Sequence, residues 1–237
     1  MSTKYFLLTK NENKSVTDNS DNQIVVLNKS LVYVLPQNDV NYYASNGMFE
    51  SSLIEWCKQF CSKNKCILDI GAHIGTYTIS LAKYCDHVYS FEPQKMTYYA
   101  LCGGIALSNI RNVTCHNYGL GSDDQVGVQT LKIVSADGGG FSLHTCAKPV
   151  LREESVSIKT LDDFDLNDIG FIKMDVEDNE RFVIMGGLKT LERSNYPKIL
   201  FESNGENKEL MDLLASIGYK ICNICGYGNM YLACHSE

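Results

Sequence analysis

The sequence predicts an α/β protein with a mostly parallel seven-stranded sheet that ends in an antiparallel hairpin. Three observations support this prediction. From Lys65 onward, short apolar runs alternate with helix-like stretches; two β-rich runs joined by GYGN close the chain; and residues 1–50 have a more polar texture of their own. Strands that alternate with helices favour parallel pairing and right-handed crossovers. We therefore expect a short β-rich N-terminal extension, 1–50, and one main domain, 51–237.

The composition is that of an ordinary globular protein. The 237 residues are 44% hydrophobic and 21% charged, which is enough for one compact core. The formal net charge of −7 opposes non-specific binding to polyanions, so neither nucleic acid nor a membrane is expected as a partner. No signal peptide and no apolar run of about 18 residues is visible, so we expect a cytoplasmic protein.

The extension contains two β-rich runs, IVVLN (24–28) and LVYVLP (31–36), after a polar stretch. This pattern predicts a mobile loop followed by a small hairpin. An exposed strand edge there invites a second copy of the chain, so a homodimer is one expectation. A helix is predicted over 49–64, because apolar residues from Leu53 to Cys61 recur on one helical face.

The main domain follows the alternating pattern to its end. Helices are expected at 75–84, 94–108, 180–194 and 206–217, and the stretch 122–160 interrupts the alternation as an insertion near the sheet rim. The expected strands are CILDI (66–70), HVYSFEP (87–93), NVTCHNYGLG (112–121), FIKMDVED (171–178), KILFES (198–203), YKICNIC (219–225) and MYLACH (230–235).

Polar residues stand at the ends of five of these strands, where core packing does not require them. They are Asp69, Glu92, Tyr118, Asp175 with Glu177, and Glu202. Ligands of parallel α/β sheets bind at the carboxyl ends of the strands, near the point where the strand order reverses. The sequence therefore predicts a functional site at this edge.

The run ILDIGAHIGTYT (67–78) predicts a cofactor site. Gly71 and Gly75 bracket a tight turn into a helix, but their G-x-x-x-G spacing differs from that of dinucleotide sites and disfavours a nicotinamide cofactor. Glu92 lies where an acid can accept hydrogen bonds from ribose hydroxyls, and an acid beside the turn suits an ammonium group. S-adenosylmethionine combines these features. The candidate cofactor-binding residues are Asp69, Gly71, Ala72, His73, Gly75, Thr76, Glu92, Pro93, Tyr118 and Asp175.

The region from about 65 to 205 resembles the FkbM-type branch of the class I S-adenosylmethionine-dependent methyltransferases, which have a Rossmann-like fold. The resemblance is carried by LDIGAHIGTYT, by FEP at 91–93, by LGS at 120–122, and by SIKTLDDF, IKMDVEDNE and ILFES further on. The family pattern has Asn where this chain has His73, and Gly where it has Asp178.

The resemblance implies O-methylation of a hydroxyl on a sugar, a sugar nucleotide or a glycan-type small molecule. By similarity, Glu177 is the candidate base, and Asp175 is a positioning residue or, with Glu202, a ligand of Mg²⁺. Magnesium stays open as a second cofactor. His144 is a further candidate for the acceptor pocket, which the resemblance places in the extension and in the insertion. Glu177 also has a purely structural interpretation, as an acid near the start of the next helix.

Two rival functions remain open from sequence. One is methylation of a ribose 2′-hydroxyl in nucleic acid, which Lys173, two residues before Asp175, weakly favours and the net charge of −7 disfavours. The other is a catalytically silent subunit that keeps the cofactor fold. The C-x-x-C of Cys222 and Cys225 lies in the terminal hairpin, where cysteines are more often core filling than zinc ligands.

Overall fold

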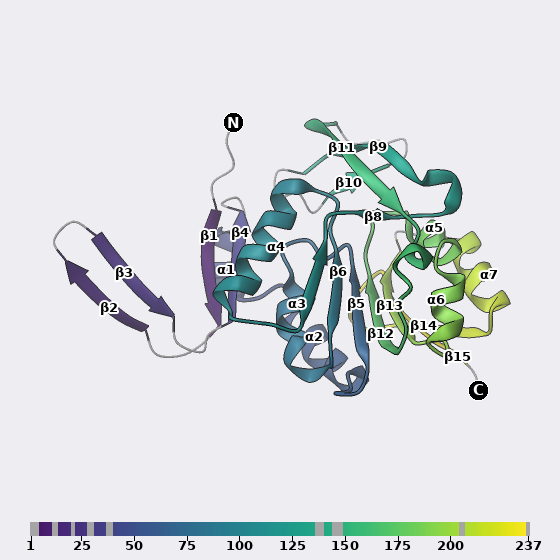
Figure 1. Cartoon of the computed structure of the whole chain (residues 1–237), viewed down its shortest axis with the longest axis horizontal. Coiled ribbons are helices and arrows are strands. Elements are labelled where there is room, and N and C mark those ends of the chain that lie inside the picture. Colours follow the sequence, from purple (N-terminus) through teal and green to yellow (C-terminus); the bar gives the residue numbers. More distant parts are fainter. Residues whose placement is uncertain are drawn as a thin grey trace.

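The computed structural model describes residues 5–10, 14–19, 22–27, 31–36, 40–135, 140–143, 149–203 and 207–235. Its centre is the expected seven-stranded sheet, with strand order β14-β15-β13-β12-β5-β6-β7 (Figure 1). The strands are β5 (Cys66–Ile70), β6 (Val88–Phe91), β7 (Val113–His116), β12 (Ile169–Met174), β13 (Lys198–Glu202), β14 (Tyr219–Asn223) and β15 (Met230–His235). Strands β5, β6, β7, β12 and β13 are parallel, whereas β15 pairs antiparallel with both β13 and β14.

Helices cover both faces of this sheet. Along β12, Phe171 packs with residues of the helices before and after β5, and the next residue, Ile172, packs with the helices that follow β12 and β13. This alternation explains why the strands are apolar at nearly every position. The helices are α2 (Ser51–Cys57), α3 (Thr76–Leu81), α4 (Lys95–Leu107), α5 (Glu180–Met185), α6 (Leu188–Arg193) and α7 (Lys208–Ser216).

Two expected helices are shorter than predicted. The helix at 49–64 is α2 followed by a single 3₁₀ turn, Lys58–Phe60. The stretch 180–194 is broken between α5 and α6 at Gly186, where an added Cβ would lie 2.0 Å from the carbonyl oxygen of Gly121. The glycine pair therefore allows the insertion to approach the helix closely, which a continuous helical pattern does not reveal.

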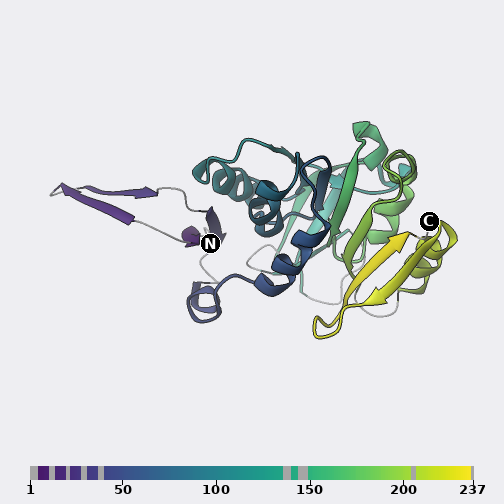
Figure 2. The same ribbon diagram turned by 90° about the horizontal axis from the view of Figure 1, so that it is seen from below.

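The predicted hairpin between the two β-rich runs of the extension is wrong. Strand β3 (Asn22–Leu27) pairs with β2 (Lys14–Asn19), in the polar stretch expected to be a loop, and β4 (Leu31–Pro36) pairs with β1 (Tyr5–Lys10). Strand β1 adds Tyr5, Phe6 and Leu8 to the apolar cluster around the buried Tyr33 and Leu35, and β4 packs on α3 and α4. The β2–β3 hairpin projects away from the main sheet (Figures 1 and 2).

The insertion forms a second sheet. Its strands are β8 (Gly119–Leu120), β9 (Gly127–Ile133), β10 (Phe141–Ser142) and β11 (Arg152–Lys159), in the order β10-β9-β11-β8. This sheet lies beside the strand edge where the site was expected (Figure 1). Among the described helices, none is long and apolar enough to cross a membrane.

Candidate active site

The turn between β5 and α3 brings two strand ends into contact. Gly71 has φ +74°, and a Cβ at this position would lie 1.8 Å from the carbonyl oxygen of Asp175. Only glycine therefore allows the ends of β5 and β12 to approach so closely. His73 and Gly75 are also left-handed, with φ of 50° and 89°. This is the crevice at which the strand order reverses, because β6 and β12 flank β5 on opposite sides.

Glu92 follows β6 and is 1% exposed. Its two carboxylate oxygens accept hydrogen bonds from the backbone N–H groups of His73, at 2.9 Å, and Gln94, at 2.8 Å. Burial raises the pKa of Glu92 to about 8, although both hydrogen bonds lower it. The carboxylate is thus held rigidly, and its remaining lone pairs can accept hydroxyl groups of a ligand.

Asp69 stabilises the turn by accepting hydrogen bonds from the start of α3. One oxygen accepts hydrogen bonds from the backbone N–H and the hydroxyl of Thr78, at 2.9 and 2.5 Å, and Thr78 also bonds Ser90 at 2.6 Å. Asp69 therefore satisfies a backbone N–H of the first turn of α3. Its other oxygen, Oδ1, is buried and has no hydrogen-bond partner among the residues that the structure describes.

A cavity of about 430 Å³ opens beside this turn. It is lined by Tyr42, Tyr43, Phe49, Glu50, Gly71, Ala72, His73, Thr76, Tyr77, Glu92, Lys173, Asp175, Glu177 and Glu202. The extension contributes the first four of these residues, partly through helix α1 (Val40–Asn46). The cavity therefore combines the turn, the expected carboxylates and a wall from the N-terminal part of the chain.

Lys173 is the buried cation of this cavity, with only 5% of its surface exposed. Its Nζ donates a hydrogen bond to Asp175 at 3.1 Å and lies 5.1 Å from the centre of the Tyr77 ring. Burial lowers the pKa of Lys173, but the carboxylates of Asp175, Asp69 and Glu50 raise it above its ordinary value. Lys173 thus stays charged and holds Asp175 in place.

Two further acids complete this group. Glu50 accepts a hydrogen bond of 2.8 Å from the hydroxyl of Tyr77. Burial, together with the charge of Asp175, raises the pKa of Glu202 to about 7. Sequence reasoning did not find Glu50, because no motif marks a residue that only the packing of the extension brings to the strand ends. Tyr77 lies inside the run ILDIGAHIGTYT, but the run does not reveal that its hydroxyl bonds Glu50.

The loop after β12 is fixed by buried polar side chains. Glu177 and Asp178 both have left-handed backbones, with φ of 53° and 72°. The carboxylate of Glu180, which is 2% exposed, accepts the backbone N–H of Val176 at 3.0 Å. Asn179 donates to the carbonyl oxygen of Leu120 at 3.0 Å, so the loop is also tied to the insertion. These contacts direct Glu177 into the cavity although its backbone is strained.

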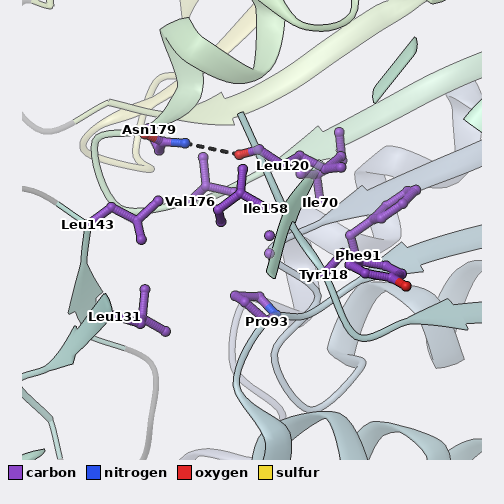
Figure 3. A pocket seen from close by; sticks show the side chains of 12 residues that line it. Ile70, Phe91, Pro93, Tyr118, Leu120, Leu131, Leu143, Ile158, Val176 and Asn179 are labelled. Carbon is purple, nitrogen blue, oxygen red and sulfur yellow. Dashed lines mark hydrogen bonds between the residues drawn. The ribbon is translucent and has the colours of Figure 1, made fainter. Parts of the chain in front are cut away.

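On the other side of Gly71 lies a narrow apolar slot of about 20 Å³ (Figure 3). Pro93 and Tyr118 line it together with strand residues such as Ile70 and Phe91, and Leu131, Leu143 and Ile158 come from the insertion. The prediction that Tyr118 stands at the end of the third strand is wrong, because β7 stops at His116. Gly71 lines both spaces, so the slot adjoins the larger cavity.

Most of the predicted site residues come together here. Asp175, Glu177 and Glu202 share the larger cavity with Gly71, Ala72, His73, Thr76 and Glu92, whereas Pro93 and Tyr118 line the slot. Asp69 and Gly75 line neither; Asp69 orders α3, and Gly75 leaves room for Leu101, whose side chain an added Cβ would approach to 2.5 Å. His144 lies outside the described residues.

A sequence profile of the FkbM methyltransferase domain matches residues 69–221 of this chain. The chain belongs to the FkbM family of S-adenosylmethionine-dependent methyltransferases. Among curated proteins, no sequence gives a significant match.

Solved structures show the same fold. The FkbM methyltransferase of Methylobacillus flagellatus KT is 20% identical with a TM-score of 0.51; the match covers 73% of this chain but 44% of that protein, so this chain spans less than half of its length. A precorrin-6y C5,15-methyltransferase of Geobacter metallireducens GS-15 is 11% identical, with a TM-score of 0.52 and coverage of 81% and 92%.

The two departures from the FkbM pattern have a backbone explanation. His73 and Asp178 replace the Asn and Gly of the pattern, and both positions are left-handed, the conformation in which Asn and Gly are most easily accommodated. The turn keeps its shape in both places. Neither departure therefore argues that this FkbM protein has lost its cofactor site.

The side chains of the cavity and the slot suit S-adenosylmethionine. Glu92 offers acceptors for ribose hydroxyls, the carboxylates of the larger cavity suit a cationic tail, and the apolar residues of the slot are of the kind that border a base. The slot itself, at about 20 Å³, has room for about one water molecule. The donor set for a metal is less complete. Among the described residues, no group of three or more His, Cys, Asp or Glu side chains is placed to hold a metal ion.

Proposed function

We propose that this FkbM protein transfers a methyl group from S-adenosylmethionine to a hydroxyl of a sugar, sugar nucleotide or glycan-type small molecule. The observation that carries the proposal is that Asp175, Glu177 and Glu202 share one cavity with Gly71 and Glu92 of the cofactor side. A hydroxyl is a poor nucleophile, so its methylation needs a base at the point of transfer. These carboxylates supply one.

The cofactor supplies an electrophilic methyl group. Glu177 accepts the proton of the acceptor hydroxyl as its oxygen is methylated, and Asp175, held by Lys173, receives a hydrogen bond from the acceptor and orients it. Positioning of the acceptor provides much of the rate of such an in-line displacement. Asp175 and Glu202 are also two of the oxygen ligands that Mg²⁺ prefers, and assays with and without EDTA test whether a divalent cation takes part.

The first experiment is a thermal melt of the protein alone, with S-adenosylhomocysteine, and with NADH. A ligand at ~100 times its dissociation constant stabilises the folded state by roughly 2.7 kcal/mol, which raises Tm by about 5–10 °C. We expect this rise with S-adenosylhomocysteine only. If a saturating concentration of S-adenosylhomocysteine does not raise Tm, the protein does not bind this cofactor and the methyltransferase assignment fails.

Methyl transfer is then measured with radiolabelled cofactor and a panel of free sugars, sugar nucleotides, capped RNA and oligonucleotides. We expect product with a sugar hydroxyl and none with nucleic acid. Product from RNA alone would instead support the ribose 2′-hydroxyl alternative, and cofactor binding without product on any acceptor would support a silent subunit.

We also propose that the protein forms a homodimer through β1, which has a single neighbour, β4, among the described strands. An unpaired strand edge invites pairing with a second copy. Light scattering tests this proposal, and a monomeric mass at assay concentration would dismiss it.

A further inference from the structure

One wall of the active-site cavity comes from the last part of the N-terminal extension and carries aromatic rings. Tyr42 contacts Tyr43 edge-on, with ring centres 5.6 Å apart, and Phe49 at 5.9 Å. Tyr42 and Phe49 expose 46% and 50% of their surface although both line the cavity. Exposed aromatic rings gathered at a cavity are typical of a surface that receives a ligand.

The charges in the same cavity are strongly unbalanced. Five of its described lining residues are carboxylic acids, namely Glu50, Glu92, Asp175, Glu177 and Glu202, and one is a lysine. Because the pKa of Glu92 is raised to about 8 and that of Glu202 to about 7, these two carry less of the negative charge at neutral pH, and the excess of acid over lysine rests on Glu50, Asp175 and Glu177. Lys173 already donates to Asp175 at 3.1 Å and is almost fully buried. The other lining side chain that can carry a positive charge is His73, on the cofactor side of the cavity.

This excess of acidic side chains favours some acceptors over others. A phosphate or diphosphate brought into the cavity would face several carboxylates, and the lysine that could neutralise it is committed to Asp175. An ammonium group gains in the same place, because carboxylates form charge-assisted hydrogen bonds with it and aromatic faces attract it. The rings of Tyr42 and Phe49 also offer flat apolar surface to the C–H face of a sugar ring.

We propose that this cavity selects an acceptor without phosphate and prefers a saccharide that carries a free amine, with its ammonium group at Glu50 and its ring against Tyr42 and Phe49. This inference rests on the proposed function and narrows it, because it removes sugar nucleotides from the acceptor class. Glu50 is assigned as the residue that binds the amine, because it belongs to the extension and not to the strands on the cofactor side of the cavity.

The test measures binding of four probes to the full-length protein loaded with S-adenosylhomocysteine, by saturation-transfer NMR and calorimetry. The probes are D-glucosamine, methyl β-D-glucopyranoside, glucose 6-phosphate and UDP-glucose. We expect D-glucosamine to bind about tenfold more tightly than the neutral glycoside, as one charge-assisted hydrogen bond would give, and neither phosphorylated probe to compete with it.

Each other outcome overturns the proposal. Equal or tighter binding of glucose 6-phosphate or UDP-glucose would show that the cavity accepts phosphate. Binding of S-adenosylhomocysteine with no binding of any sugar would refute the acceptor class and leave the methyltransferase assignment intact. Failure to bind S-adenosylhomocysteine would overturn the proposed function and this inference together.

Two variants separate the charge of Glu50 from the shape of the cavity. Glu50→Gln keeps an oxygen that can accept the hydroxyl of Tyr77 but removes the negative charge. We expect it to bind S-adenosylhomocysteine normally and to lose the preference for D-glucosamine over the neutral glycoside. Glu55→Gln, on α2 at an ion pair with Lys58 outside the cavity, is the matched control and should keep that preference. An unchanged preference in Glu50→Gln contradicts the assignment.

Discussion

Glu92 shows how one buried carboxylate can serve both the fold and the cofactor. It accepts the backbone N–H groups of His73 and Gln94 while it lines the cavity. Glu92→Gln keeps the size of the side chain but replaces one of the two accepting oxygens by an NH2 group, which can accept neither the backbone N–H that it faces nor a hydroxyl of the ligand. Each hydrogen bond lost in this way costs about 1–3 kcal/mol. We expect the dissociation constant for S-adenosylhomocysteine to rise by about 10- to 100-fold, measured by calorimetry. The control variant Glu153→Gln changes an exposed side chain and should bind S-adenosylhomocysteine as the wild type does. Equal affinity of the two variants would show that Glu92 does not contribute to cofactor binding.

Glu177 is tested at the same scale by its effect on turnover. Because it is assigned as the base, Glu177→Gln should lower kcat by about 10²–10⁴-fold, the range typical of general base catalysis. The dissociation constant for S-adenosylhomocysteine should change little. Steady-state kinetics with the best acceptor of the panel measures both. If Glu202→Gln loses turnover and Glu177→Gln does not, the base is Glu202, whose pKa of about 7 suits that role.

At the scale of elements, the turn after β5 sets the distance between two strand ends. Gly71→Ala adds a Cβ that would lie 1.8 Å from the carbonyl oxygen of Asp175, so β5 and β12 must separate. Gly47→Ala is a matched control, because Gly47 has nearly the same φ, +75°, and nothing within 4 Å of an added Cβ. We expect the control to lose about 1–2 kcal/mol from left-handed strain. Gly71→Ala should lose considerably more and fail to bind S-adenosylhomocysteine.

Thermal melts and calorimetry distinguish these two glycine variants. For a chain of this size, 1–2 kcal/mol lowers Tm by about 2–8 °C. If the two variants melt alike and both bind S-adenosylhomocysteine, then backbone conformation, rather than the close approach of the strands, is what the glycine provides.

At the scale of the whole molecule, buried acids make the stability of the protein depend on pH. Burial raises the pKa of Glu180 to about 7, from an ordinary value of 4.5. Between these values the folded protein binds the proton more tightly than the unfolded chain does, so this group lowers stability as pH rises. Glu180→Gln removes that dependence. The Tm of the variant relative to wild type should therefore increase from pH 5 to pH 8.

The difference in Tm is the informative quantity, because any constant effect of the amide on packing cancels between the two pH values. Glu92 and Glu202 have pKa values raised in the same direction, to about 8 and about 7, so the wild type should itself lose stability over this range. A Tm difference that does not change with pH would show that Glu180 titrates normally.

The sequence by itself determined the main sheet and the cofactor side of the site. Strand and helix periodicity depends on local burial, and the glycine turn and Glu92 are separated by a single strand and helix, so their spacing along the chain is informative. The strand pattern also predicts that Asp175, Glu177 and Glu202 lie at one edge of the sheet, because parallel strands have their carboxyl ends at the same edge.

Only the tertiary structure decided the acceptor side. Glu50 and Tyr77 meet where the extension packs on α3, and β4 pairs with the more distant β1, whereas β3 pairs with β2. Lys173 was visible as a residue two before Asp175, its local ion-pair partner, but its burial depends on neighbouring strands. Contacts between segments far apart in the chain leave no local pattern, and the wall that the extension adds to the cavity is made of such contacts.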